Sequence, residues 1–305
     1  VGSGVRLLDA GLHRLRDVLR PVRLVLAIPA AQRIPAFIPV RSLDFLPTNL
    51  PSELDEFVGR ESELQTIDTL LDERGARLVT LVGLGGVGKT RLLLKAGTRR
   101  IDRFADGVWL VDLADVRSPD DVPRAIGAAL HMPGHPNGLD AEQVLAAAID
   151  GKHLLLLLDN YEQVIGAATL PPALLRTCKH LVCLVTSRER LRVPGECVLE
   201  VQPLAAPDRD APVAEQVACD SMRLFCLRAA DARRGRELST EELQVGAQIC
   251  RHLCGIPLAL EIAAAHLSRL TPAELLDSLA ARTDGMTTDT RGVPARHRSM
   301  RAVMD

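Results

Sequence analysis

The chain has 305 residues, which is enough for two or three domains and a sizeable core. Its 37 basic and 39 acidic residues nearly cancel, so bulk charge does not indicate a nucleic-acid-binding protein. No apolar stretch approaches the roughly 20 residues that span a bilayer, and the run LVLAIPAA is too short for a signal peptide. We therefore expect a cytoplasmic protein without membrane association.

Seven cysteines all lie in the second half of the chain. In a chain of this size they suit buried small hydrophobic positions of a reducing compartment better than a disulfide framework. Cys250 and Cys254 lie one helical turn apart with His252 between them, but no further ligands follow at a recognised zinc spacing. We expect no zinc site.

The N-terminal part divides into two segments. Residues 1–28 alternate apolar and polar side chains and are expected to form a strand, a turn and a second strand. Residues 29–52 contain several prolines, which indicates an extended linker. A new unit then opens with EFVGRESELQTIDTLLDERG (56–75), whose apolar residues have helical spacing up to Gly75.

From residue 53 to residue 205 the pattern predicts an α/β domain. Short apolar runs separated by helical segments are typical of a parallel sheet that helices cover on both faces. The expected strands are 77–83, 107–114, 153–159, 181–187 and 197–201, and the expected helices after the first are 89–101, 118–131 and 140–150.

Residues 206–285 predict an all-helical domain, because apolar residues recur there at intervals of three and four. The segment 271–282 begins with Thr271 as a cap and Pro272 at the first helical position. Residues 286–305 start polar and end in RHRSMRAVMD, which we expect to be a helix that the end of the chain truncates.

A phosphate-binding loop is the strongest functional signal. GLGGVGKT (83–90) matches the pattern G-x-x-x-x-G-K-[ST], known as Walker A, and lies between a predicted strand and a predicted helix. Glycines let main-chain amides turn towards a β-phosphate, and the helix N-terminus adds its positive dipole. Lys89, one of only four lysines, is expected to reach the β- and γ-phosphates, and Thr90 to offer its hydroxyl to Mg²⁺.

The leucine-rich strand 153–159 ends in Asp159, the expected Mg²⁺ partner through water. A busy ATPase would be expected to carry a second acid next, and the residue there is Asn160. Glu162 is the nearest acid that could polarise an attacking water, although a solvated loop charge explains it equally well. Arg188 follows the strand LVCLVTS (181–187), from whose tip it could sense a γ-phosphate.

Taken together, these motifs resemble the STAND class of P-loop NTPases, and in particular the NB-ARC-like ATPase module of large bacterial LuxR- and SARP-type transcriptional regulators. The resemblance covers about residues 47–305 and rests on five motifs in order: FVGRESEL (57–64), GLGGVGKT (83–90), LLLLDN (155–160), VTSRERLRVPGE (185–196) and CGIPLALEIAAAHL (254–267).

The resemblance implies ATP or ADP with Mg²⁺ as ligands, Val58–Arg60 against adenine and ribose, and Pro257 against the adenine. A plain surface arginine remains an equal interpretation of Arg60. Lys89, Asp159, Glu162 and Arg188 are the candidate catalytic residues, and Thr90 and Asp159 the metal ligands. The candidate nucleotide-binding residues are Val58, Gly59, Arg60, Gly83, Gly85, Gly86, Val87, Gly88, Lys89, Thr90, Arg91 and Pro257.

More weakly, residues 9–28 resemble the last strands of a class III nucleotidyl cyclase domain, but they contain none of its catalytic positions, so we expect no cyclase activity. RHRSMRAVMD resembles the entry to the winged-helix domain of the regulators. Their nucleotide-sensing His and partner-sensing repeats would lie beyond residue 305, and DNA binding would need domains absent from this chain.

Three functions stay open at this point. The first is a regulatory switch that holds nucleotide, hydrolyses it slowly at most, and acts on a protein partner or by self-association. The second is a multiple-turnover ATPase with Glu162 as base. The third is a partner-docking module with a vestigial site, against which the intact Gly83, Gly88, Lys89, Thr90 and Asp159 argue.

Overall fold

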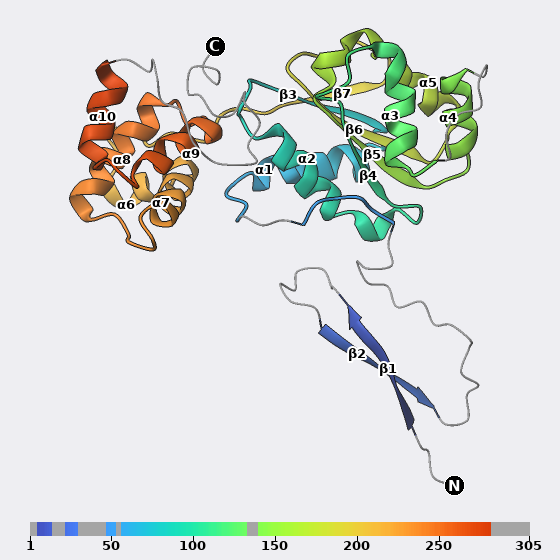
Figure 1. Ribbon diagram of the computed structural model, residues 1–305, viewed down its shortest axis with the longest axis horizontal. Coiled ribbons are helices and arrows are strands. Elements are labelled where there is room, and N and C mark those ends of the chain that lie inside the picture. Colours follow the sequence, from blue (N-terminus) through green and yellow to red (C-terminus); the bar gives the residue numbers. More distant parts are fainter. Residues whose placement is uncertain (1–4, 14–21, 30–46, 53–55, 133–139, 282–305) are drawn as a thin grey trace.

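The computed structural model describes residues 5–13, 22–29, 47–52, 56–132 and 140–281 (Figure 1). At the N-terminus, β1 (Val5–His13) and β2 (Val22–Pro29) form an antiparallel two-stranded sheet, which confirms the two strands expected there. Their likeness to a cyclase domain stays a prediction. The segment compared with a winged-helix entry lies outside the described residues.

All five strands expected in the α/β part are present and pair in parallel in the order β4-β5-β6-β3-β7. The strand β6 therefore lies between β3, which precedes the phosphate loop, and β5, which ends in Asp159. The strands are β3 (Leu78–Val82), β4 (Val108–Asp112), β5 (Leu154–Asp159), β6 (Leu181–Ser187) and β7 (Glu196–Glu200).

Helices cover the two faces of this sheet, as Figure 1 shows. One face packs Val79, Leu155 and Leu184 against α1 and α2, and the other packs Leu156 and Val185 against α3, α4 and α5. Residues of one strand thus alternate between two cores, which explains why consecutive positions such as Leu154–Leu158 of β5 are all apolar. The helices are α1 (Glu61–Asp68), continued by a π-helical turn (Thr69–Glu73), α2 (Lys89–Thr98), α3 (Val122–Ala129), α4 (Ala141–Ile149) and α5 (Leu170–Thr177). Three short 3-10 segments complete this part: Ile101–Arg103, Pro119–Asp121 and Tyr161–Ala167.

One part of the expected linker belongs to this domain. Thr48 forms a parallel bridge with Val108, and the Asn49 side chain accepts from the Leu110 amide at 2.6 Å and donates to the Leu110 carbonyl at 2.8 Å. We call residues 47–50 the edge strap. The strap occupies hydrogen-bonding groups that the edge strand β4 would otherwise expose. The extent of the linker over 29–52 stays a prediction.

The C-terminal part is helical, as predicted, with a core of its own. Thr271 begins the last helix as expected, since its hydroxyl accepts from the Glu274 amide at 3.3 Å. Its helices are α6 (Val213–Ala218), α7 (Asp220–Ala232), α8 (Thr240–His252), α9 (Pro257–His266) and α10 (Pro272–Ala281). Among the described residues, no helix has the length and apolar character that crossing a bilayer requires.

Candidate nucleotide site

The loop Gly83–Thr90 joins β3 to α2 at the carboxyl edge of the sheet. Gly88 caps α2 with φ of 95°, a left-handed conformation that costs glycine little. A Cβ atom on Gly83 would come within 2.5 Å of the Val201 carbonyl oxygen, so only glycine fits beside the end of β7. A backbone that depends on glycine and an adjoining helix N-terminus are two features of phosphate-binding loops.

Lys89 lies against this loop. Its ammonium donates to the carbonyl oxygens of Gly83 at 2.7 Å and Leu84 at 2.9 Å, and only 9% of the residue is exposed. Burial lowers the pKa of Lys89, and the nearby Arg188 lowers it further, while Glu162 and Asp159 oppose the shift. The charges of the other candidate catalytic residues, Asp159, Glu162 and Arg188, therefore act on this ammonium.

Asp159 faces the start of α2. The Thr90 hydroxyl lies 3.0 Å from both carboxylate oxygens, and the Thr186 hydroxyl donates to Oδ1. Burial raises the pKa of Asp159, and the hydrogen bonds from Thr186 and Thr90 act in the opposite direction. A hydroxyl beside a carboxylate is a pair of hard oxygen ligands, which suits Mg²⁺ bound between protein and phosphates.

Glu162 turns back towards this site. Its Oε1 lies 3.5 Å from Nε of Arg188, whereas Oε2 is buried and has no hydrogen-bond partner among the described residues. The side chain is 15% exposed, so the interpretation as a solvated loop charge was wrong. Arg188 is mostly exposed and lies against Gly85, where its guanidinium would be 3.4 Å from an added Cβ.

The segment Val58–Arg60 meets the same loop from the other side. Arg60 is buried and donates to the Val87 carbonyl at 3.0 Å, so the alternative of a surface arginine was wrong. Gly59 has φ of 70°, and a Cβ there would lie 2.5 Å from Asp220 of α7. Val58 packs into the core of the helical part. This segment therefore connects the phosphate loop with the helical domain.

The first turn of α9 completes the surroundings of the loop. The Leu258 amide donates to the Gly86 carbonyl at 3.1 Å, and Pro257 Cγ lies 4.0 Å from the position of a Cβ on Gly88. The structure thus places Pro257 beside the phosphate loop, and its contact with the adenine stays a prediction. Arg91 instead uses its guanidinium for Glu261 of α9 at 3.2 Å and the Glu56 carbonyl at 2.9 Å, which leaves it in an interdomain contact.

Sequence reasoning missed several residues that shape this site. Thr186 was not among the candidate site residues, although its hydroxyl donates to the Asp159 carboxylate. Asp112 lies opposite Asp159 in the register of β4 and β5, and Asn160 donates to both carboxylates. Their positions at the ends of strands could have indicated these residues, because the carboxyl ends of parallel strands meet at one edge of the sheet.

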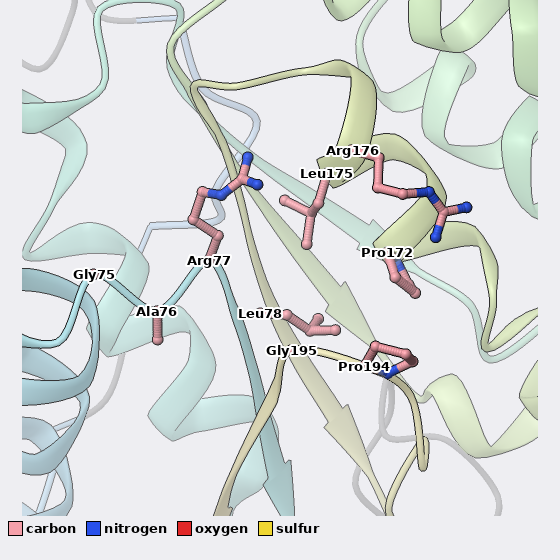
Figure 2. Close-up of a pocket in the computed structure, with 9 residues that line it drawn as sticks. All are labelled: Gly75, Ala76, Arg77, Leu78, Pro172, Leu175, Arg176, Pro194 and Gly195. Atoms are coloured by element: carbon pink, nitrogen blue, oxygen red, sulfur yellow. The ribbon is translucent and has the colours of Figure 1, made fainter.

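A pocket of about 350 Å³ lies elsewhere (Figure 2). Arg77 and Leu78 at the start of β3, together with Pro172 and Arg176 of α5, contribute to its wall. These residues lie at the amino end of β3, whereas the phosphate loop follows its carboxyl end. The pocket is therefore separate from the candidate site.

Comparisons with known proteins find relatives in two groups of bacteria. An uncharacterized protein of Mycobacterium tuberculosis is 37% identical over 230 residues, which cover 75% of this chain and 55% of the relative. An HTH-type transcriptional regulator of the same species is 33% identical over 230 residues, covering 75% of this chain and 24% of the regulator. The regulatory protein AfsR of Streptomyces coelicolor is 28% identical over 239 residues, 73% of this chain and 22% of AfsR.

Among solved structures, a STAND protein with a tetratricopeptide repeat sensor from Pyrococcus horikoshii has 18% identity and a TM-score of 0.42. That likeness covers 76% of this chain and 33% of the other. The match covers 55% of the first curated relatives, so the chain spans about half of their length.

The parallel sheet, the phosphate loop and the carboxylate two strands away define a P-loop NTPase. Within that class, residues 56–287 match the model of the AAA ATPase domain, and the chain belongs to this family. Membership of an ATPase family implies a nucleotide ligand.

Proposed function

We propose that the chain is an ATP- and ADP-binding switch module of a bacterial signalling or transcriptional regulator, with slow Mg²⁺-dependent hydrolysis at most. The observation that carries this proposal is the hydrogen bond of 3.1 Å from the Leu258 amide to the Gly86 carbonyl. Through this main-chain bond between the helical part and the phosphate loop, a change in the loop would alter the packing of α9.

In this proposal Lys89 binds the β- and γ-phosphates after leaving the carbonyl groups of Gly83 and Leu84. Thr90 and Asp159 would hold Mg²⁺, which neutralises phosphate charge when bound. One observation supports them in that role: Thr90 Oγ1 lies 3.0 Å from both Asp159 oxygens. Arg188 would sense the γ-phosphate from the tip of β6, the strand beside β3.

Asn160 supports slow turnover. An amide cannot accept a proton as a carboxylate does, so the residue after Asp159 offers no general base. The nucleotide would then be held for long periods in one state, which is what a switch requires.

A second candidate function is a multiple-turnover ATPase with Glu162 as base. The buried, unpaired Oε2 of Glu162 favours it, because an unpaired acceptor in the site could bind the attacking water. Arg188, 3.5 Å from the other oxygen, would have to release this carboxylate first.

The deciding experiment is hydrolysis of labelled ATP by the purified chain with Mg²⁺, first with the protein in excess and then with ATP in excess. The switch predicts that bound ATP persists, or converts once and remains bound as ADP. Steady release of product over minutes would support the ATPase instead. A melting temperature that Mg²⁺-ATP leaves unchanged would overturn both in favour of a vestigial site.

The domain limits belong to the same proposal: a possible upstream-domain remnant at 1–28, a nucleotide-binding domain at 53–205 and a helical domain at 206–285. The linker would extend over 29–52, and its residues 47–50 form the edge strap on β4. A winged-helix segment would begin at 286. A protein partner or self-association, in the cytoplasm, would read the switch, and DNA would be bound only through domains outside this chain.

A further inference from the structure

Two carboxylates end neighbouring strands of the sheet at the same level. Asp112 is the last residue of β4 and Asp159 the last of β5, and the parallel register pairs them directly. Like charges opposite each other on adjacent strands repel. The side chain that lies with both of them is Asn160.

The Asn160 amide bridges this pair. Its Nδ2 donates to Oδ1 of Asp112 at 2.9 Å and to Oδ2 of Asp159 at 3.2 Å. An amide group has two N–H donors, whereas an ionised carboxylate has none. An amide at this position can therefore donate to both neighbours, which a second carboxylate could not.

The main chain fixes Asn160 in place for this task. The residue adopts φ of 61° and ψ of 40°, a left-handed conformation that Asn tolerates better than most side chains. Its main-chain amide donates to the Thr186 hydroxyl at 3.0 Å. Since the Thr186 hydroxyl also donates to Oδ1 of Asp159, both carboxylate oxygens are held from β5 and β6 together.

We propose that Asn160 and Asp112 are positioning residues of the metal site, which hold the Asp159 carboxylate against Thr90. Asp112 is then the reason why residue 160 carries an amide in place of a second acid. The part of this inference that concerns the metal rests on the proposed function. The pairing of Asp112 with Asn160 does not.

The first test measures the affinity of fluorescent ADP with and without Mg²⁺. In Asn160→Ala the gain in affinity from Mg²⁺ should fall roughly tenfold, as expected for loss of a hydrogen bond to a charged group, while affinity without Mg²⁺ stays within about twofold. Asp115→Ala is the matched control, because Asp115 is an exposed acid in the segment that follows Asp112. An unchanged gain in Asn160→Ala would overturn the positioning role.

Two variants of Asp112 separate positioning from bulk charge. Asp112→Asn keeps an acceptor oxygen for Asn160 and should keep most of the Mg²⁺ gain, whereas Asp112→Ala should lose several-fold. Equal losses in both variants would show that only the charge matters, and would overturn this role for Asp112.

The second test needs no nucleotide. Asn160→Asp would place three carboxylates together and should lower the melting temperature by about 5 °C without Mg²⁺. Adding Asp112→Asn exchanges amide and carboxylate and should restore most of that loss, which a double-mutant cycle quantifies. Absence of both the loss and the recovery would overturn the pairing. If the wild-type chain binds no ADP, the proposed function fails, and this second test still decides the pairing.

Discussion

The main-chain amide of Leu258, in the first turn of α9, donates a hydrogen bond of 3.1 Å to the carbonyl of Gly86 in the phosphate loop. Residues 172 positions apart in sequence are thereby joined without any side chain. Close by, Glu261 of α9 accepts from Arg91 of α2 and from Arg228 of α7. The helical part therefore contacts the phosphate loop and the helix that follows it, and both contacts can be tested.

We expect Glu261→Gln to weaken the contact between the two parts. Glu261 Oε1 lies 3.2 Å from Arg91 and 3.3 Å from Arg228, and the side chain is 31% exposed. Because partly exposed ion pairs contribute about 1 kcal/mol or less, stability should change little. ADP release, measured by stopped-flow fluorescence, should accelerate about three- to tenfold if α9 must move to free the nucleotide.

The control for that variant is Asp121→Asn, which removes an exposed pair with Arg124 at 3.1 Å, beside α3. This substitution should leave ADP release unchanged. An equal acceleration in both variants, or none in Glu261→Gln, would argue that these ion pairs do not couple the parts.

Lys89→Ala should abolish nucleotide binding without unfolding the sheet. The variant loses the one ammonium that the phosphate loop encloses, so affinity for ADP should fall by about 100-fold or more, the scale of charge-assisted phosphate contacts. Isothermal titration gives the affinity and circular dichroism the fold. Lys152→Ala is the control, because Lys152 is exposed before the start of β5, at the opposite edge of the sheet. Retained affinity in Lys89→Ala would refute the whole site assignment.

Much of this fold follows from local pattern. Every strand of the parallel sheet was predicted, because short apolar runs such as LLLLL at 154–158 indicate strands that are buried on both faces. The phosphate loop and Asp159 followed from the strand context. The helix α5 was not predicted, since LPPALLRT contains two prolines, which here lie in its first turn where they are tolerated.

Long-range contacts were beyond sequence pattern. The pairing of Asn160 with Asp112 depends on strand register across 48 residues, and no local spacing encodes that register. The edge strap was hidden for a similar reason. A proline-rich segment predicts extended backbone, and extended backbone serves equally as a linker or as an added edge of a sheet.

Glu162→Gln separates the two candidate functions. A switch that never uses this carboxylate should hydrolyse bound ATP within about threefold of the wild-type rate, whereas loss of a true general base removes 10²–10⁴-fold, roughly. We expect the small change. Rapid-quench measurements with labelled ATP give the rate, and Glu189→Gln is the control, since Glu189 is an exposed acid directly after Arg188. A hundredfold loss confined to Glu162→Gln would establish it as the base.

Gly107→Ala tests the edge strap. Gly107 has φ of 97°, and a Cβ there would lie 1.9 Å from the Pro47 carbonyl oxygen, which accepts from the Val108 amide. Alanine therefore meets both a strained backbone and the strap itself. Gly151→Ala isolates the first effect, because Gly151 has φ of 73° with nothing within 4 Å of an added Cβ. Gly151→Ala should lower the free energy of unfolding in urea by about 1 kcal/mol, the cost of alanine in a left-handed conformation.

The cost for Gly107→Ala should be at least twice as large, about 2–4 kcal/mol, since the strap must also detach from β4. Detachment has its own signature in hydrogen exchange. The amides of Val108 and Leu110 donate to Pro47 and to Asn49, so both should lose protection in Gly107→Ala and keep it in Gly151→Ala. Equal unfolding costs with unchanged protection would mean that the strap contributes nothing to the edge of the sheet.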